Sequence, residues 1–353
     1  MTLETARIER LHAIASKDAP QCPPYDSKID ALVEQSLRYL ESDEAHESVR
    51  IDAYWPKWDS PWWHMLLLHE MGLTSRIPEA IVEAITSALG KHYLKFFPFT
   101  EEEVPSGVDP LNQVACHCQL GTMHQLLTTY GIDVDSRLPW LRPWYLRYQL
   151  QDGGLNCDEA AYTRAVQKSS LVSTLPPLEA MLASKDPAPD EVAYLDCGAK
   201  YLIEKKLWRS SSTGKPIDKD WLELCFPRFY HYDVLRGLSF LLAWARRSAK
   251  SLPLEAVAEC IEHIDNQFPD GRIRIQRIAW AGANTRYFDR STGVWSKRPA
   301  QSHSLLQAMS QVGAISHTLT QDWSDARANL LAIIDAGLIE ENTPSDFARI
   351  HLK

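Results

Sequence analysis

Apolar residues recur along the chain in two helical patterns. In the first, they form a single stripe, as at Ile29, Leu32, Val33, Leu37 and Leu40, which fall on one face of a helix. Similar stripes occur near residues 77–95, 137–150, 192–203, 254–268 and 321–338. Each of these helices needs one partner face and leaves the other in water.

The second pattern is apolar on nearly every side. It occurs at residues 61–72, 116–131, 169–182, 231–245 and 302–313. A helix without a polar face is covered all round or lines a dry cavity. Three of these segments end in glycine, which caps a helix in the left-handed conformation. The pattern therefore predicts inner helices that are wrapped by the amphipathic ones.

The two kinds of helix alternate, with inner helices starting every 50–70 residues or so, too long for common solenoid repeats. We predict one all-α domain over residues 1–353, an α/α toroid of about six helix pairs, with segment 1–24 completing the inner ring. Long loops precede the inner helices, at 43–60, 96–112, 152–167, 207–228 and 269–300. Loops of that length are usually functional, and we expect them to gather over the mouth of a central cavity.

Composition excludes several classes of protein. The net charge is −9 and no block of Lys and Arg occurs, which argues against a nucleic-acid partner. No apolar run reaches the length of a membrane span, and the charged N-terminus lacks the apolar core of a signal peptide. We expect a cytoplasmic protein. Its seven cysteines are an odd number without disulfide-type spacing, which favours free thiols or metal ligands.

Two turns after amphipathic helices share the pattern Q-x-x-D-G, at residues 149–153 and 267–271. This pattern resembles the repeat of the squalene-cyclase and protein-prenyltransferase superfamily. The whole chain resembles the bacterial prenyltransferase-like proteins of that group. Segment 229–238 is similar to the inner-helix start that carries a zinc-binding histidine in protein prenyltransferases. The resemblance implies an α/α toroid and a small, largely apolar, isoprenoid-like substrate, with cyclase, lyase or metal-assisted transferase chemistry.

The chain also departs from that superfamily. The nearest match to the acidic D-x-D-D run of terpene cyclases, residues 133–136, lacks the last acid. Leu155 replaces the tryptophan that closes the repeat, and the zinc pair Asp-x-Cys is absent at residues 168–170. The family reaction therefore does not transfer directly.

Three cysteines lie at the predicted rim of the cavity: Cys116, Cys118 and Cys157. Thiolates bind zinc, and a catalytic zinc takes three protein ligands and an open position. We predict a zinc site from these three, with His231 or His303 as a further ligand. The alternative is that the thiols pack as small hydrophobic groups.

The catalytic candidates are the polar residues at two inner-helix starts: His231, Tyr232, Asp233 and His303. A histidine near a carboxylate can act as a general base or as a ligand of fixed tautomer. The alternative is structural, because Asp233 also suits the first turn of a helix.

The substrate-binding candidates are aromatic or polar residues near the same rim: Trp58, Trp62, His64, Asn156, Lys168, Arg228 and Tyr230. Aromatic rings can hold an apolar or cationic group, and loop residues on a rigid scaffold often carry function. The alternatives are plain core packing and solvated loops.

Two other functions stay open from the sequence. A non-catalytic binding or scaffold toroid would explain the missing superfamily motifs. A carbohydrate-active toroid would need two carboxylates about 5–9 Å apart, and no pair stands out among the acids of the predicted loops.

Overall fold

The computed structural model describes residues 3–22, 24–282 and 284–340. Within these ranges the chain is mostly helical, which confirms the predicted class at that level. The other positions of the predicted domain 1–353 lie outside the described residues.

Four helices carry buried residues on every side, as the all-round apolar pattern predicts. They are α4 (Pro61–Glu70), α6 (His117–Tyr130), α10 (Leu171–Leu182) and α12 (Val234–Ser248). Helices α6 and α10 approach closely, and a Cβ atom added to Gly121 would lie 2.4 Å from the backbone nitrogen of Pro177. Only glycine permits this contact, which fixes the first turns of α6 against α10.

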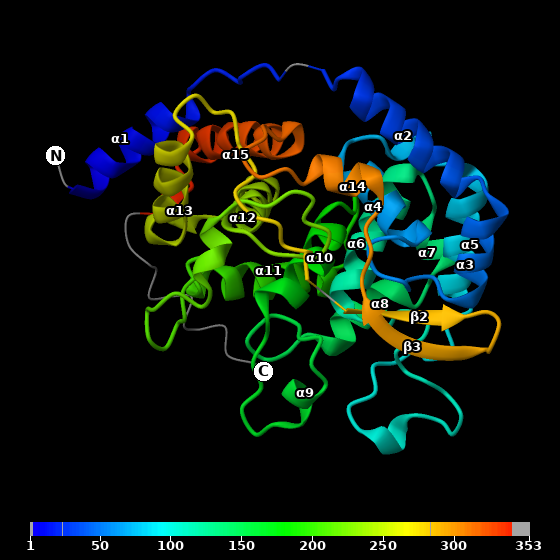
Figure 1. The fold of residues 1–353 in the computed structure, drawn as a ribbon. Coiled ribbons are helices and arrows are strands. Elements are labelled where there is room, and N and C mark those ends of the chain that lie inside the picture. Colours follow the sequence, from blue (N-terminus) through cyan, green and yellow to red (C-terminus); the bar gives the residue numbers. More distant parts are fainter. Residues whose placement is uncertain (1–2, 23, 283, 341–353) are drawn as a thin grey trace.

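Amphipathic helices surround these four (Figure 1). They are α2 (Ser27–Leu40), α3 (Asp43–Ile51), α5 (Glu79–Gly90), α8 (Leu141–Tyr148), α11 (Pro189–Glu204), α13 (Leu254–Gln267) and α15 (His317–Asp335). Their apolar residues join those of the inner helices in one buried cluster that runs from Leu11 to Ile333. Helix α3 lies within a segment expected to be a loop. Ser42 caps it and acidic residues fill its first turn.

The N-terminal helix does not take the inner position predicted for it. Helix α1 (Leu3–Ala15) buries only Leu11, Ile14 and Ala15, and Leu3 is 92 % exposed. It packs on α15 and α13 from outside, so α15 lies between α1 and α12 (Figure 1). The fifth inner segment, expected at 302–313, is the short helix α14 (Ser304–Met309), which packs on α2.

The long loops contain small elements of their own. Strands β2 (Asn284–Asp289) and β3 (Val294–Pro299) form an antiparallel hairpin in which Phe288 is opposite Trp295. Strands β1 (Leu252–Pro253) and β4 (Ile339–Glu340) form a short parallel pair. The helices α7 (Val134–Arg137) and α9 (Ala160–Thr163) and 3₁₀ turns at 74–76, 101–103 and 219–222 complete the described elements. The hairpin and the loops around 96–112 and 152–167 lie on one side of the molecule (Figure 1).

Among the described helices, none combines the length and apolar character needed to cross a membrane.

Candidate metal centre

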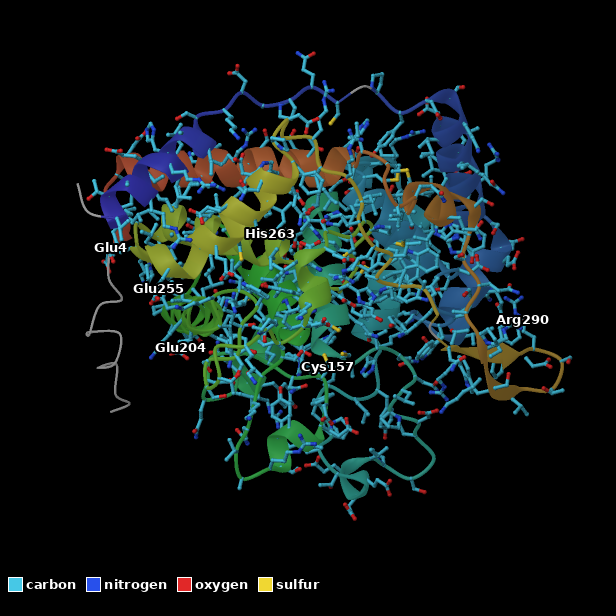
Figure 2. All side chains as sticks on the ribbon, turned by 60° about the vertical axis from the view of Figure 1, so that its left-hand side comes forward. Glu4, Cys157, Glu204, Glu255, His263 and Arg290 are labelled. Atoms are coloured by element: carbon cyan, nitrogen blue, oxygen red, sulfur yellow. The ribbon has the colours of Figure 1, made fainter. Side chains whose placement is uncertain are left out.

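Three cysteine sulfurs converge at the N-terminal end of α6. Cys116 precedes the helix, Cys118 lies in its first turn, and Cys157 comes from the loop that leads to α10. The sulfur of Cys118 lies 3.4 Å from that of Cys116 and 3.6 Å from that of Cys157. All three sulfurs lie within 4.8 Å of one another. Figure 2 shows Cys157 where the helical body meets the loops. The structure thus brings the three predicted ligands together.

The loop that carries Cys157 is anchored to the start of α10. The Asp152 carboxylate accepts hydrogen bonds from the backbone N–H and the hydroxyl of Ser169. The N–H of Leu155 donates to Oγ1 of Thr174 at 2.8 Å, and the N–H of Cys157 donates to Oγ of Ser173 at 3.0 Å. The site therefore depends on the contact between α6 and α10.

The glycine turn before Cys157 allows this loop to approach the neighbouring helix. Gly153 has a φ of +92°, and a Cβ atom there would lie 2.2 Å from the carbonyl oxygen of Cys197 on α11. The Q-x-x-D-G pattern thus has a local structural purpose at this position.

His117 lies between two of the cysteines in sequence, but its ring nitrogens have other partners. Its Nδ1 accepts a hydrogen bond from Nε1–H of Trp144 at 2.8 Å. The neutral ring therefore carries its proton on Nε2, which lies 3.0 Å from the hydroxyl of Tyr162. That hydroxyl donates in turn to the carbonyl of Tyr148. Both ring nitrogens of His117 are occupied, so it is not a fourth ligand.

The three thiols cannot all ionise without a cation, because they share one buried space. Hydrogen bonding to Cys116 and Cys157, together with burial, raises the pKa of Cys118 well above its usual value. Burial opposes ionisation of Cys157 too, but hydrogen bonds from the other two thiols outweigh it and lower its pKa. A divalent cation would favour ionisation of all three.

The sulfurs border a cavity of about 400 Å³. Cys116 and Cys157 both line it, and most of its other walls are aromatic or aliphatic: Tyr54, Trp55, Phe97, Phe99, Val104, Leu111 and Val114. Polar contacts are few, the main ones being Gln119 and three residues nearer the surface, Thr100, Glu101 and Glu159. Such a cavity suits a small, largely apolar ligand.

A lysine lies beside these aromatic walls. The ammonium of Lys57 is 5.5–5.9 Å from the ring centres of Tyr54, Trp55, Trp58 and Tyr230, and donates to the hydroxyl of Tyr230 at 3.2 Å. Burial lowers the pKa of Lys57, while the charges of Cys118 and Cys116 raise it. Lys57 was not predicted from the sequence, although a lone lysine within the aromatic run 54–58 was an available signal.

His231 lies next to this group but outside the cysteine cluster. Its ring packs 4.5 Å from that of Tyr230 and 6.3 Å from that of Trp58. Burial, and then the charges of Arg277 and Lys57, lower its pKa to about 3, so the ring is neutral. Within the described chain, its buried Nε2 has no hydrogen-bond partner.

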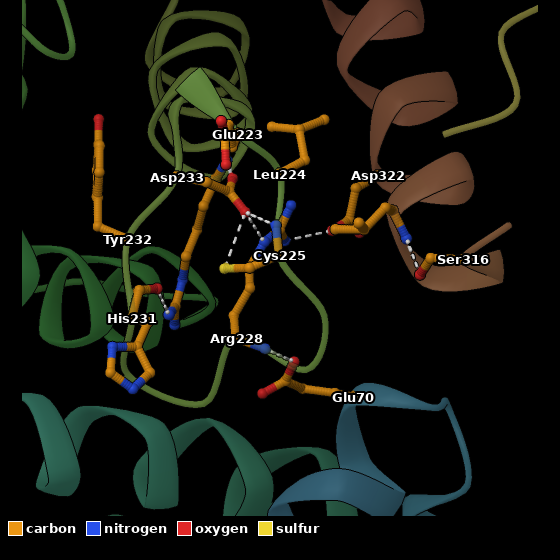
Figure 3. Close-up of polar contacts among 12 residues, drawn as sticks. Glu70, Glu223, Leu224, Cys225, Arg228, His231, Tyr232, Asp233, Ser316 and Asp322 are labelled. Carbon is orange, nitrogen blue, oxygen red and sulfur yellow. Dashed lines mark hydrogen bonds and ion pairs between the residues drawn. The ribbon is translucent and has the colours of Figure 1, made fainter. Parts of the chain in front are cut away.

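The structure places Asp233 and Arg228 in a buried ion-pair network instead (Figure 3). Nε of Arg228 lies 2.9 Å from the Asp233 carboxylate, and its Nη1 lies 2.6 Å from that of Asp322. Asp233 is fully buried and also accepts from the N–H of Arg236, which caps α12. The backbone N–H of Arg228 donates to Glu70. These contacts hold the segment 225–233 in place, and Asp233 is not part of the cluster of Cys116, Cys118 and Cys157.

The other predicted residues are dispersed. Tyr232 is buried and donates to the carbonyl of Leu207, and Trp62 and Trp58 are buried in the core. Asn156 donates to the carbonyl of Lys168, whose side chain is exposed. His64 and His303 stack on each other with ring centres 3.6 Å apart, in a different cavity from the thiols.

No protein-family model, curated protein or solved structure matches this chain, so the assignment of the three thiols depends on their geometry.

Proposed function

We propose that the protein is a metal-dependent enzyme in which Cys116, Cys118 and Cys157 bind one zinc ion at the wall of an apolar cavity. The observation that carries this proposal is the convergence of three sulfurs within 4.8 Å, from segments 39 residues apart. Three thiols in such a cluster match the soft ligands that zinc takes in proteins.

A site with three ligands favours catalysis over a purely structural role. Structural zinc sites have four protein ligands, whereas catalytic ones keep a position for water or substrate. Among the described residues, no fourth His, Cys, Asp or Glu belongs to the cluster, and both nitrogens of His117 are occupied. Since Cys116 and Cys157 line the cavity, we propose that the open position faces it.

The surrounding residues suit a small, largely apolar substrate. Zinc would polarise a bound oxygen or sulfur of the substrate as a Lewis acid. The ring walls of the cavity would exclude water, and Lys57 would offset the negative charge that three thiolates leave on a divalent cation. The reaction class that fits is a lyase, cyclase or metal-assisted transferase. We also propose that the inner helices α4, α6, α10 and α12 and their amphipathic cover form an α/α toroid, with the site at one end.

Two measurements on the full chain test the proposal. Elemental analysis after purification without chelator should give one zinc per chain, with little in Cys118→Ser and an unchanged amount in Cys197→Ser, which alters an exposed thiol. Incubation with a cell extract, followed by mass spectrometry of apolar metabolites, should show a compound consumed by the wild type and not by Cys118→Ser. A wild type with no zinc, or equal zinc in both variants, contradicts the metal site. Zinc without turnover would indicate a non-catalytic binding protein.

A further inference from the structure

A second cavity, of about 640 Å³, lies between α2, α3, α4, α14 and the hairpin β2–β3. Trp55 and Pro56 line it, and Trp55 also lines the cavity beside the thiols, so this one residue stands between the two spaces. The second cavity contains no cysteine and has a much more polar lining. Its side chains therefore suit a different ligand from that of the proposed metal site.

Two stacked histidines line this cavity. The rings of His64 and His303 are parallel within 18°, with centres 3.6 Å apart. Nδ1 of His64 lies 2.7 Å from the hydroxyl of Ser36, which is buried. Burial lowers the pKa of both histidines, that of His303 to about 3, so both rings are neutral.

One hydrogen bond fixes the tautomer of His303. The backbone N–H of Leu306 donates to Nδ1 of His303 at 3.3 Å, which caps α14. Nδ1 is therefore unprotonated, and the proton of the neutral ring is on Nε2. That Nε2–H is buried, and no acceptor for it occurs in the described part of the chain. An unsatisfied buried donor is costly, and a ligand oxygen in this cavity would satisfy it.

Two arginines of the hairpin line the same cavity. Arg290 lies in the turn of the hairpin (Figure 2) and Arg298 on β3. Both are exposed, and neither lies within salt-bridge distance of a carboxylate among the described residues, although the charge of Arg298 lowers the pKa of Asp59. Arg298 also lies over the ring of Tyr287. By contrast, the neighbouring Arg286 pairs with Asp109. Two unpaired guanidinium groups facing one space are suited to a carboxylate or a phosphate.

Two acidic residues of the same cavity limit the charge of the ligand. Asp59 and Glu44 also line the cavity, and burial raises the pKa of Asp59 to about 6. These carboxyls would repel a doubly charged phosphate more strongly than a singly charged carboxylate. The aromatic rings of Tyr39, Trp55, Phe288 and Trp295 supply an apolar surface beside the arginines.

We propose that this cavity binds a small aromatic or aliphatic carboxylate, whose anionic group contacts Arg290 and Arg298 and whose apolar part lies against the aromatic walls. The donor of His303 provides a further contact to an oxygen of the ligand.

Calorimetric titration of the full chain with sodium benzoate tests this site. The wild type should bind benzoate, the double variant Arg290→Ala, Arg298→Ala should bind at least tenfold more weakly, and Arg272→Ala, which alters an exposed arginine elsewhere, should match the wild type. His303→Phe keeps the ring stack but removes the donor and should weaken binding severalfold. Equal affinities for benzoate in the wild type and the double variant would overturn the proposal.

Two probes and one variant define the ligand class and separate this proposal from the zinc site. Benzyl alcohol tests the need for an anion, and inorganic phosphate tests the preference for a carboxylate. Binding of either with the affinity of benzoate contradicts the assignment. Cys118→Ser should bind benzoate like the wild type, whatever its zinc content, whereas loss of benzoate binding in this variant would contradict an independent site.

Discussion

The sulfur of Cys157 lies 3.6 Å from that of Cys118, although the two residues belong to different segments. This contact joins the loop before α10 to the first turn of α6. Thiolates that ligate one ion lie at about this separation, and the close packing of α6 on α10 at Gly121 holds the two helices together.

Cobalt binding should report directly on the three thiols. Co²⁺ added to the metal-free protein should give the intense thiolate-to-metal charge-transfer absorption of a site with several sulfur ligands. Cys116→Ser, Cys118→Ser and Cys157→Ser should each reduce that absorption by about one third or more, since each removes one of three sulfurs. Cys260→Ser serves as the control, because it changes a buried thiol outside the cluster. A spectrum insensitive to Cys157 would remove this residue from the site.

Lys57 should strengthen metal binding without being a ligand. Its ammonium lies in electrostatic reach of Cys116 and Cys118 and is fixed by Tyr230. Replacing it by Gln removes one positive charge beside a site with net negative charge. We expect zinc affinity, measured by competition with a chelating dye, to fall roughly fivefold, about 1 kcal/mol. Lys168→Gln, at an exposed position, should leave the affinity unchanged. Tighter zinc binding in Lys57→Gln would contradict the electrostatic role.

Asp233 should matter for stability. Asp233→Asn keeps a capping side chain on α12 but leaves the buried Arg228 without one of its two carboxylate partners. Breaking such a pair costs about 3–5 kcal/mol of unfolding free energy. The matched change Asp158→Asn, in an exposed pair with Arg164, should cost less than about 1 kcal/mol. Urea unfolding measures both. Equal stabilities of the two variants would contradict this role for Asp233.

Acid sensitivity should depend partly on His124 of α6. Burial lowers its pKa from the usual 6.5 to about 4. The unfolded chain therefore takes up a proton at a higher pH than the folded chain does. Stability from this group is complete above pH 6.5 and falls as the pH drops from about 6.5 to about 4. Over that range His124→Leu should lose up to about 3 kcal/mol less stability than the wild type.

Chemical unfolding at several pH values measures this difference. Thr128→Ala, at an exposed position of the same helix without a titratable group, is the control and should follow the wild-type profile. Parallel profiles for the wild type and His124→Leu would show that His124 does not contribute to the acid sensitivity.

The spacing of apolar residues predicted the helices well. Helices buried on all sides and helices buried on one side have different patterns of apolar residues. The ranges 61–72, 116–131, 169–182 and 231–245 correspond to α4, α6, α10 and α12. The position of each helix within the fold was harder to predict. The sequence does not show which neighbours α1 and α15 contact, and in the structure α15 packs between α1 and α12. The hairpin 284–299 was missed because its residues are mostly exposed and lack clean alternation.

The sequence was sufficient to predict which residues could bind a metal and which of them lie near the start of a helix. Cys116, Cys118 and Cys157 were grouped because all three lie near predicted inner-helix starts, and the structure brings them together. The pairing of His64 with His303 could not be predicted, since it depends on how α14 meets α4. Likewise, Arg228 and Asp233 form a salt bridge that no spacing rule indicates.

Native mass spectrometry of the freshly purified full chain is the decisive test of the zinc site. We expect a species heavier than the bare polypeptide by one zinc ion, less the protons released from the thiols, and loss of this added mass in Cys118→Ser. A wild-type chain that has only its polypeptide mass, even after incubation with stoichiometric zinc, would contradict it.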